Sequence, residues 1–188
     1  MKKPRVQKQM SDEAVKTKTG KTWSEWFGVL DRAGAKKWNH KEITAYLRDE
    51  QAVGRWWNQI VAVGYERARG LRAMNQKSSG DFAASGSRTL NAPIGDAYDA
   101  WADETTRAKW LGGAKMEIST ATKDKSLRAA WDGGKSRFSV MFYEKAGGRC
   151  QVTIDHMKLT TAKDVAKMKT YWFAALNRLE SHLDAKKQ

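Results

Sequence analysis

Residues 152–159 read Val-Thr-Ile-Asp-His-Met-Lys-Leu, and residues 161–185 follow them as one long segment. In the first stretch Val152, Ile154 and His156 alternate with polar residues, which predicts a strand with one inward face. In the second stretch apolar residues recur every three or four positions, which predicts a helix with a single buried stripe. A sheet with one apolar face needs a cover, and this helix has the matching stripe. The two stretches therefore predict an antiparallel sheet wrapped on a long C-terminal helix.

Working outward, alternating apolar residues predict four further strands, at residues 82–90, 116–120, 127–131 and 138–142. Gly-rich turns at residues 132–134 and 146–148 join consecutive strands, as in a meander of hairpins. Pro93 opens, and Gly112 closes, a pair of short helices between the first two strands. The predicted order is strand, two helices, four strands and a long helix.

The first part of the chain has a different sequence pattern, because it contains signals for helices only. Thr22 with Glu25, and Asn39 with Glu42, form two predicted capping boxes. A polar stretch at residues 76–81 separates the two parts. The predicted fold class is therefore α+β. An N-terminal all-α helical domain is expected at 1–77, with a flexible arm at 1–10, and the sheet-and-helix domain at 78–188.

The second domain resembles the SRPBCC, or START-like, helix-grip superfamily over residues 82–186. The motifs that carry the resemblance are Ser87–Ile94, Ala97–Trp101, Arg107–Leu111, Val152–Leu159 and Met168–Leu176. The last two look like the branch of heat-shock ATPase-activator homologues. The resemblance implies a helix-grip fold. Members of this superfamily bind lipids, sterols or polyketides, act as cyclases, or serve as co-chaperone modules.

The first domain is similar to a small bacterial domain of unknown function over residues 11–72. The matching stretches are Thr19–Phe27, Asn39–Ile43 and Val63–Gly70. This resemblance implies no activity.

Composition excludes several protein classes. The 188 residues include one cysteine, so an internally disulfide-bonded scaffold is excluded. No apolar run reaches the roughly 18–20 residues that span a bilayer, and a cytoplasmic protein is expected. The formal net charge is +14. Residues 1–77 hold 17 lysines and arginines against 8 acidic residues, and residues 78–188 hold 18 against 13, so the excess is concentrated in the first part.

The inward faces of the predicted sheet and helix define a candidate site for a small hydrophobic ligand. Its members are Trp131, Phe138, Val140, Phe142, Val152, Ile154, His156, Met168, Trp172 and Leu176. The alternative is that these side chains pack against one another in a dry core. His156 would orient a ligand hydroxyl, act as the acid–base group of a polyketide-cyclase-like enzyme, or remain a hydrogen-bonded histidine at the sheet rim.

The basic first domain supports a nucleic-acid hypothesis. Predicted helices at 39–49 and 55–69, joined by a turn, have helix-turn-helix proportions. The candidate contacts are Arg55, Asn58, Gln59, Arg67, Arg69 and Arg72. Trp56 and Trp57 are expected in the core. A solvated charged surface would account for the same residues without any partner.

Signals for catalysis and cofactors are absent from the sequence. One cysteine and three scattered histidines do not form a metal-ligand set. Gly20-Lys21-Thr22 is not a phosphate loop, because Val15 stands where that motif needs glycine. No catalytic residue, metal or cofactor is therefore predicted. The leading hypothesis is a non-catalytic protein whose second domain binds a small hydrophobic ligand or a protein partner. Nucleic-acid binding through residues 1–77 and a cyclase-like enzyme are the alternatives.

Overall fold

A computed structural model describes residues 10–185 of the chain. The chain divides into two compact units, Met1–Met74 and Asn75–Gln188, and each is described by itself. Apart from Met10, the arm predicted at residues 1–10 lies outside the described residues.

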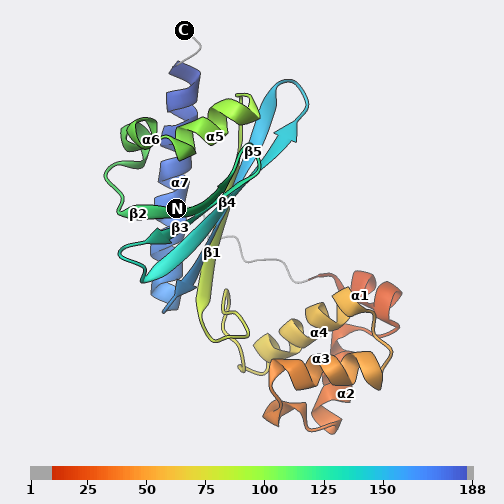
Figure 1. The fold of residues 1–188 in the computed structure, drawn as a ribbon. Coiled ribbons are helices and arrows are strands. Elements are labelled where there is room, and N and C mark those ends of the chain that lie inside the picture. The colour runs from red at the N-terminus through yellow and green to blue at the C-terminus, as the bar shows by residue number, and fades with distance from the viewer. Residues whose placement is uncertain (1–9, 186–188) are drawn as a thin grey trace, which may run out of the picture. The chain divides into compact units, whose positions relative to one another are not determined.

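The N-terminal unit is a bundle of short helices (Figure 1). They are α1 (Asp12–Thr19), α2 (Trp23–Arg32), the 3₁₀ turn η1 (Ala35–Lys37), α3 (His40–Asp49) and α4 (Arg55–Ala68). Both predicted capping boxes are present, at the starts of α2 and α3. Trp26, Leu30, Ile43, Leu47 and Tyr65 are fully buried in a common core. The apolar faces of α2, α3 and α4 therefore hold this unit together.

The C-terminal unit has the predicted order of elements. It contains β1 (Phe82–Leu90), α5 (Ile94–Ala102), α6 (Glu104–Leu111), β2 (Met116–Thr122), β3 (Ser126–Trp131), β4 (Ser136–Lys145), β5 (Arg149–Leu159) and α7 (Ala162–Ala185). The strands form one antiparallel sheet in the order β1-β5-β4-β3-β2. The predicted α+β class and the sheet packed on a long C-terminal helix are confirmed.

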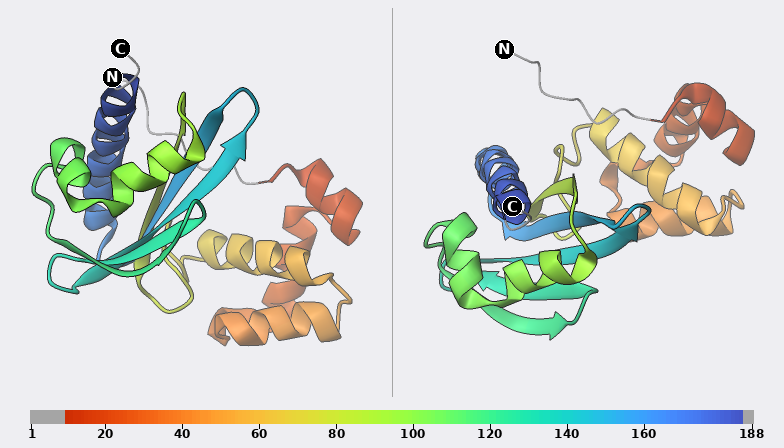
Figure 2. Two further views of the ribbon diagram at one scale, coloured as in Figure 1. Left: turned by 45° about the horizontal axis from the view of Figure 1, so that its top comes forward. Right: turned by 90° about the horizontal axis from the view of Figure 1, so that it is seen from above.

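Helices cover one face of this sheet. Alternate residues of the strands, among them Phe138, Val140 and Ile154, are buried in the same core as Trp101 of α5 and Trp172 of α7. Figure 2 shows α7 nearly end-on in its right-hand view, running beside the curved sheet. The other face of the sheet carries Arg128, Arg137, Ser139 and other side chains that are exposed or half-buried. The sheet therefore has one packed face and one open face.

Two β-bulges alter the predicted alternation. In β2, Ile118 lies opposite Ala129 but Thr120 lies opposite Arg128, so Ser119 is the extra residue. Thr120 therefore does not share a face with Ile118, as strict alternation along residues 116–120 would have placed it. The second bulge is in β5, where Met157 and Lys158 lie between the pairs that β5 forms with β1. A bulge bends a strand and redirects its side chains, and both bulges border the open face.

Candidate functional site

The ten residues predicted for a hydrophobic ligand lie together between the sheet and α7. Nine of them are buried, and Trp131 is half-buried at the edge of the set. The ring centroid of Trp172 lies 4.9 Å from that of Phe138 and 5.2 Å from that of Trp131. The Tyr98 and Phe142 rings are 5.6 Å apart. Such centroid separations are those of packed aromatic pairs, so aromatic rings occupy the space between the strands and the helix.

His156 is held inside this aromatic core by two hydrogen bonds. The indole Nε1–H of Trp172 donates to Nδ1 of His156 (3.0 Å), so the ring is protonated on Nε2 and donates to Oγ of Ser136 (2.8 Å). Burial lowers the pKa of His156 to about 4, so the ring is neutral at pH 7. Both ring nitrogens are engaged and the residue has no exposed surface, so His156 acts as a structural hydrogen-bonding group.

A small pocket opens at one end of the seam between sheet and helix. Trp131, Ser136, Lys158 and Met168 contribute to its lining, and its volume is about 200 Å³. Sites for drug-sized ligands have volumes of about 300–1,000 Å³. This opening is therefore smaller than the cavity that the hydrophobic-ligand hypothesis requires.

The open face of the sheet carries a larger depression that the sequence analysis did not predict. It has a volume of about 900 Å³ and crosses β2 to β5. Arg128, Lys135, Arg137 and Lys158 line it, together with serine and threonine residues, and its lining includes no carboxylate. This depression is called the basic groove below. Alternation along β3 and β4 places Arg128 and Arg137 outward, but only the strand register shows that they share one groove.

The six residues predicted for nucleic-acid contacts are all in the N-terminal unit, but most are engaged within it. Asn58 is buried. Nε of Arg69 lies 3.1 Å from Oδ1 of Asp31, and Nε of Arg72 lies 2.9 Å from Oε2 of Glu66. Arg55 remains exposed at the first turn of α4.

The neighbouring tryptophans of α4 differ from the expectation that both are in the core. Trp56 is 56% exposed, and its ring lies edge-on to Trp57, which is half-buried. The core expectation is therefore wrong for Trp56. Its position in the first turn of α4 leaves it outside the buried face that Val61 and Tyr65 form.

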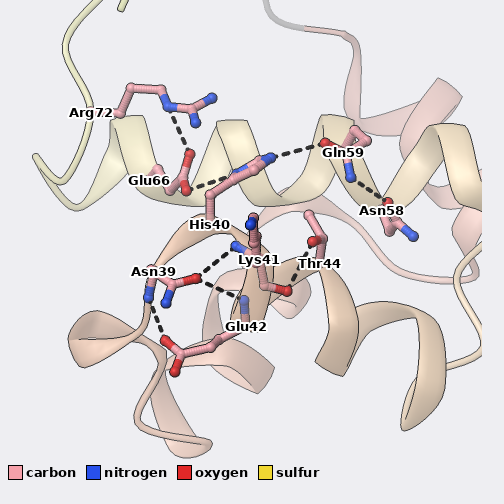
Figure 3. Close-up of polar contacts among 9 residues, drawn as sticks. All are labelled: Asn39, His40, Lys41, Glu42, Thr44, Asn58, Gln59, Glu66 and Arg72. Carbon is pink, nitrogen blue, oxygen red and sulfur yellow. Dashed lines mark hydrogen bonds and ion pairs between the residues drawn. The ribbon is translucent and has the colours of Figure 1, made fainter. Parts of the chain in front are cut away.

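A polar cluster in the N-terminal unit joins α3 to α4 (Figure 3). Nδ1 of His40 lies 2.9 Å from Oε1 of Glu66, and Nε2 of His40 lies 2.9 Å from Oε1 of Gln59. The hydrogen bond to Glu66 raises the pKa of His40 above its ordinary value, because a ring that donates from both nitrogens is the charged imidazolium. Arg72 contacts the other oxygen of Glu66. The three side chains are only 16% (His40), 6% (Glu66) and 10% (Arg72) exposed.

The sequence analysis did not predict this cluster, because it treated the three histidines as scattered. The spacing of Glu66 from His40 along the chain gives no local signal, because the contact depends on how α3 packs on α4. Within residues 10–185, no group of three or more histidine, cysteine or acidic side chains could hold a metal ion. Likewise, no helix in the described part of the chain is long and apolar enough to cross a membrane.

The helices that carry this cluster have counterparts in other proteins. Residues 9–66 match the family model DUF4287, a domain of unknown function. The DUF4287 match confirms the predicted resemblance of the first domain and includes His40, Gln59 and Glu66 but not Arg72. A comparison of the whole chain with curated proteins found no match.

The C-terminal region has structural counterparts at low sequence identity. CalU16 from Micromonospora echinospora is 18% identical with a TM-score of 0.48, and the alignment covers 56% of this chain and 76% of that one. The Aha1 protein from Colwellia psychrerythraea, solved as a dimer, is 15% identical with a TM-score of 0.48 over 54% of this chain and 95% of that one. An AHSA1-like protein from Rhizobium etli is 19% identical with a TM-score of 0.45 over 53% of this chain and 80% of that one. At these identities the likeness concerns the fold alone.

Proposed function

We propose that this chain is a non-catalytic binding protein for an anionic ligand, and that its helix-grip unit carries the binding surface. The observation that carries the proposal is the basic groove, whose lining holds four cationic side chains and no carboxylate. Two of the four, Lys135 and Lys158, are paired with Asp132 and Asp81, and the two arginines have no such partner among the described residues. The formal net charge of +14 favours the approach of any anion to the protein.

The packing inside the helix-grip unit supports an external site over an internal one. A small hydrophobic ligand would have to displace Trp172, which is 1% exposed and contacts several other rings. The cyclase-like alternative depends on His156 as an acid–base group. Its two ring nitrogens are already engaged by Trp172 and Ser136, so the geometry favours a protein without catalysis.

Nucleic-acid binding through the N-terminal unit is a second candidate function. Arg55 and the 56% exposed Trp56, which lie together on the first turn of α4, favour it. The carboxylates that engage Arg69 and Arg72 reduce the number of arginines available to phosphates. We also propose that residues 1–77 and 78–188 are separate domains, so that each candidate function belongs to one domain.

Two titrations of the intact protein test the proposed function. The first uses N-phenyl-1-naphthylamine, a neutral apolar dye whose fluorescence rises in a hydrophobic site. The second uses pyrophosphate, followed by calorimetry at low and high ionic strength. We expect pyrophosphate binding that weakens as salt screens the cationic groove, and no saturable binding of the dye. Saturable dye binding without any anion binding would instead support the internal hydrophobic site and overturn the proposal.

A further inference from the structure

We infer that the basic groove binds the phosphate group of a small phosphorylated molecule, with Arg128 and Arg137 as its principal ligands. This inference rests on the proposed function and names its ligand class.

The strand register brings the two arginines together on the open face. Arg128 of β3 lies opposite Ser139 of β4, and Arg137 lies two residues before Ser139 on the same strand. Diagonal neighbours of this kind have Cα atoms about 7–8 Å apart, which long side chains can bridge. Thr120 of β2 lies opposite Arg128 on its other side, so hydroxyl groups flank that guanidinium on both neighbouring strands.

No carboxylate forms an ion pair with these two arginines, whereas four other arginines of the described residues are paired. Arg48, Arg69, Arg72 and Arg88 each have a carboxylate within ion-pair distance. Among residues 10–185, no carboxylate oxygen lies within 4.0 Å of a side-chain nitrogen of Arg128 or Arg137.

Two acidic residues share the open face but lie outside the groove lining. Asp155 of β5 is opposite Ser139 and is 4.0 Å from Nζ of Lys77. Glu117 of β2 is opposite Ala130. Asp155 is thus a diagonal neighbour of Arg137, and Glu117 is a diagonal neighbour of Arg128, but neither acid forms an ion pair with its arginine. The two neighbouring arginines therefore have no ion-paired carboxylate, and a bound anion would offset the repulsion between their charges.

Lys158 adds a third cationic side chain, which is ion-paired with Asp81 and is held at the groove by an unusual backbone. Its φ of 63° lies in the left-handed region, at the bulge where β5 meets β1. The Asp81 carboxylate accepts the Lys158 N–H (3.3 Å), and its other oxygen lies 3.7 Å from Nζ. A lysine in this region costs of order 1–3 kcal/mol, and such strain clusters at binding sites.

The chemistry of the lining favours a phosphate. Guanidinium groups bind phosphate oxygens through two parallel N–H donors, and serine and threonine hydroxyls supply further donors. The groove volume of about 900 Å³ is that of a small-molecule site. Its one aromatic lining residue, Phe138, is 1% exposed and offers no face on which a nucleobase could stack. A small phosphorylated molecule therefore suits the groove better than a single-stranded nucleic acid.

The test is calorimetric titration of the intact protein with pyrophosphate at low ionic strength, with sulfate and a single-stranded oligonucleotide as further probes. The variant is R128Q/R137Q. The matched control is R32Q/R55Q, which removes two exposed arginines from the N-terminal unit and the same total charge. We expect both variants to fold, because all four side chains are solvent-exposed. Thermal unfolding of each variant checks this.

The expected result is pyrophosphate binding that weakens about tenfold or more in R128Q/R137Q and stays within about twofold of wild type in R32Q/R55Q. Equal weakening in both variants would refute the assignment of pyrophosphate binding to the basic groove, but it would be consistent with general anion binding by the protein. Oligonucleotide binding that R32Q/R55Q abolishes, without any pyrophosphate binding by the wild-type protein, would overturn the inference in favour of the N-terminal unit. Failure of the wild-type protein to bind any of the three probes would refute the proposed function itself.

Discussion

Replacing Trp172 with phenylalanine tests whether the helix-grip interior is a filled and fully hydrogen-bonded core. The substitution keeps an aromatic ring beside Phe138 and Trp131 but removes the Nε1–H that donates to His156. The smaller ring leaves a cavity that costs about 1–2 kcal/mol, by comparison with other large-to-small core changes. The unsatisfied Nδ1 of buried His156 costs about 1–3 kcal/mol more. We therefore expect the free energy of unfolding to fall by about 2–5 kcal/mol.

The matched control is the next residue of α7. Phe173 is 65% exposed, and its only described ring contact is with the Arg88 guanidinium at 5.6 Å. Phe173→Ala should lower the free energy of unfolding by less than about 1 kcal/mol. Hydrogen exchange of peptides from β4, β5 and α7, read by mass spectrometry, reports the stability of this unit separately from the N-terminal helices. A loss below about 1 kcal/mol for Trp172→Phe would refute the packed, hydrogen-bonded core and reopen the internal ligand site.

Three further predictions concern stability. A Cβ on Gly64 would lie 2.3 Å from the Trp23 ring, so Gly64→Ala should destabilise the N-terminal unit by about 1–3 kcal/mol in urea denaturation. The control is Gly28→Ala, whose Cβ would meet only the flexible end of the Arg32 side chain at 3.4 Å and which should stabilise the unit by up to about 1 kcal/mol. Because the folded-state pKa of His40 is raised, the stability that His40 contributes to the folded protein is fully present below the unfolded pKa of about 6.5 and is lost as pH rises through the folded value. A free energy of unfolding that depends on pH in the same way in His40→Gln as in the wild type would contradict this. The folded-state pKa of His156 is lowered to about 4, so the stability that neutral His156 contributes to the folded protein is present above about pH 6.5 and is lost as pH falls toward 4. Nitrogen-15 spectra showing a charged His156 ring at pH 6 would contradict this.

Local patterns in the sequence were sufficient to predict most of the fold. Thr22 with Glu25 and Asn39 with Glu42 form their capping boxes because each box involves only four consecutive residues. The strand alternation and the stripe of α7 also act over short distances, so the burial of Ile154 was predictable. The bulge at Ser119 was not predictable, because it depends on how β2 pairs with β3.

The functional surfaces were harder to predict because they depend on contacts between distant residues. The sequence assigned positive charge to the N-terminal part, but Arg69 and Arg72 turn out to face Asp31 and Glu66. Net charge counts residues and cannot show which of them are paired. Arg128, by contrast, belongs to the less basic part of the chain and remains without a carboxylate partner within the described residues. In both cases the pairing depends on residues of other helices or strands: Asp31 for Arg69, and the facing strand residues Ser139 and Thr120 for Arg128.

The central claim is that the helix-grip unit binds its ligand on the open sheet face and keeps a packed interior. The most direct test is a nitrogen-15 NMR titration of the intact protein with pyrophosphate. We predict shifts for the backbone amides of Arg128, Arg137 and Ser139, while the indole N–H signal of Trp172, hydrogen-bonded to His156, stays unchanged. Shifts confined to the Trp172 indole and the residues around it, with the amides of the groove unmoved, would contradict the account.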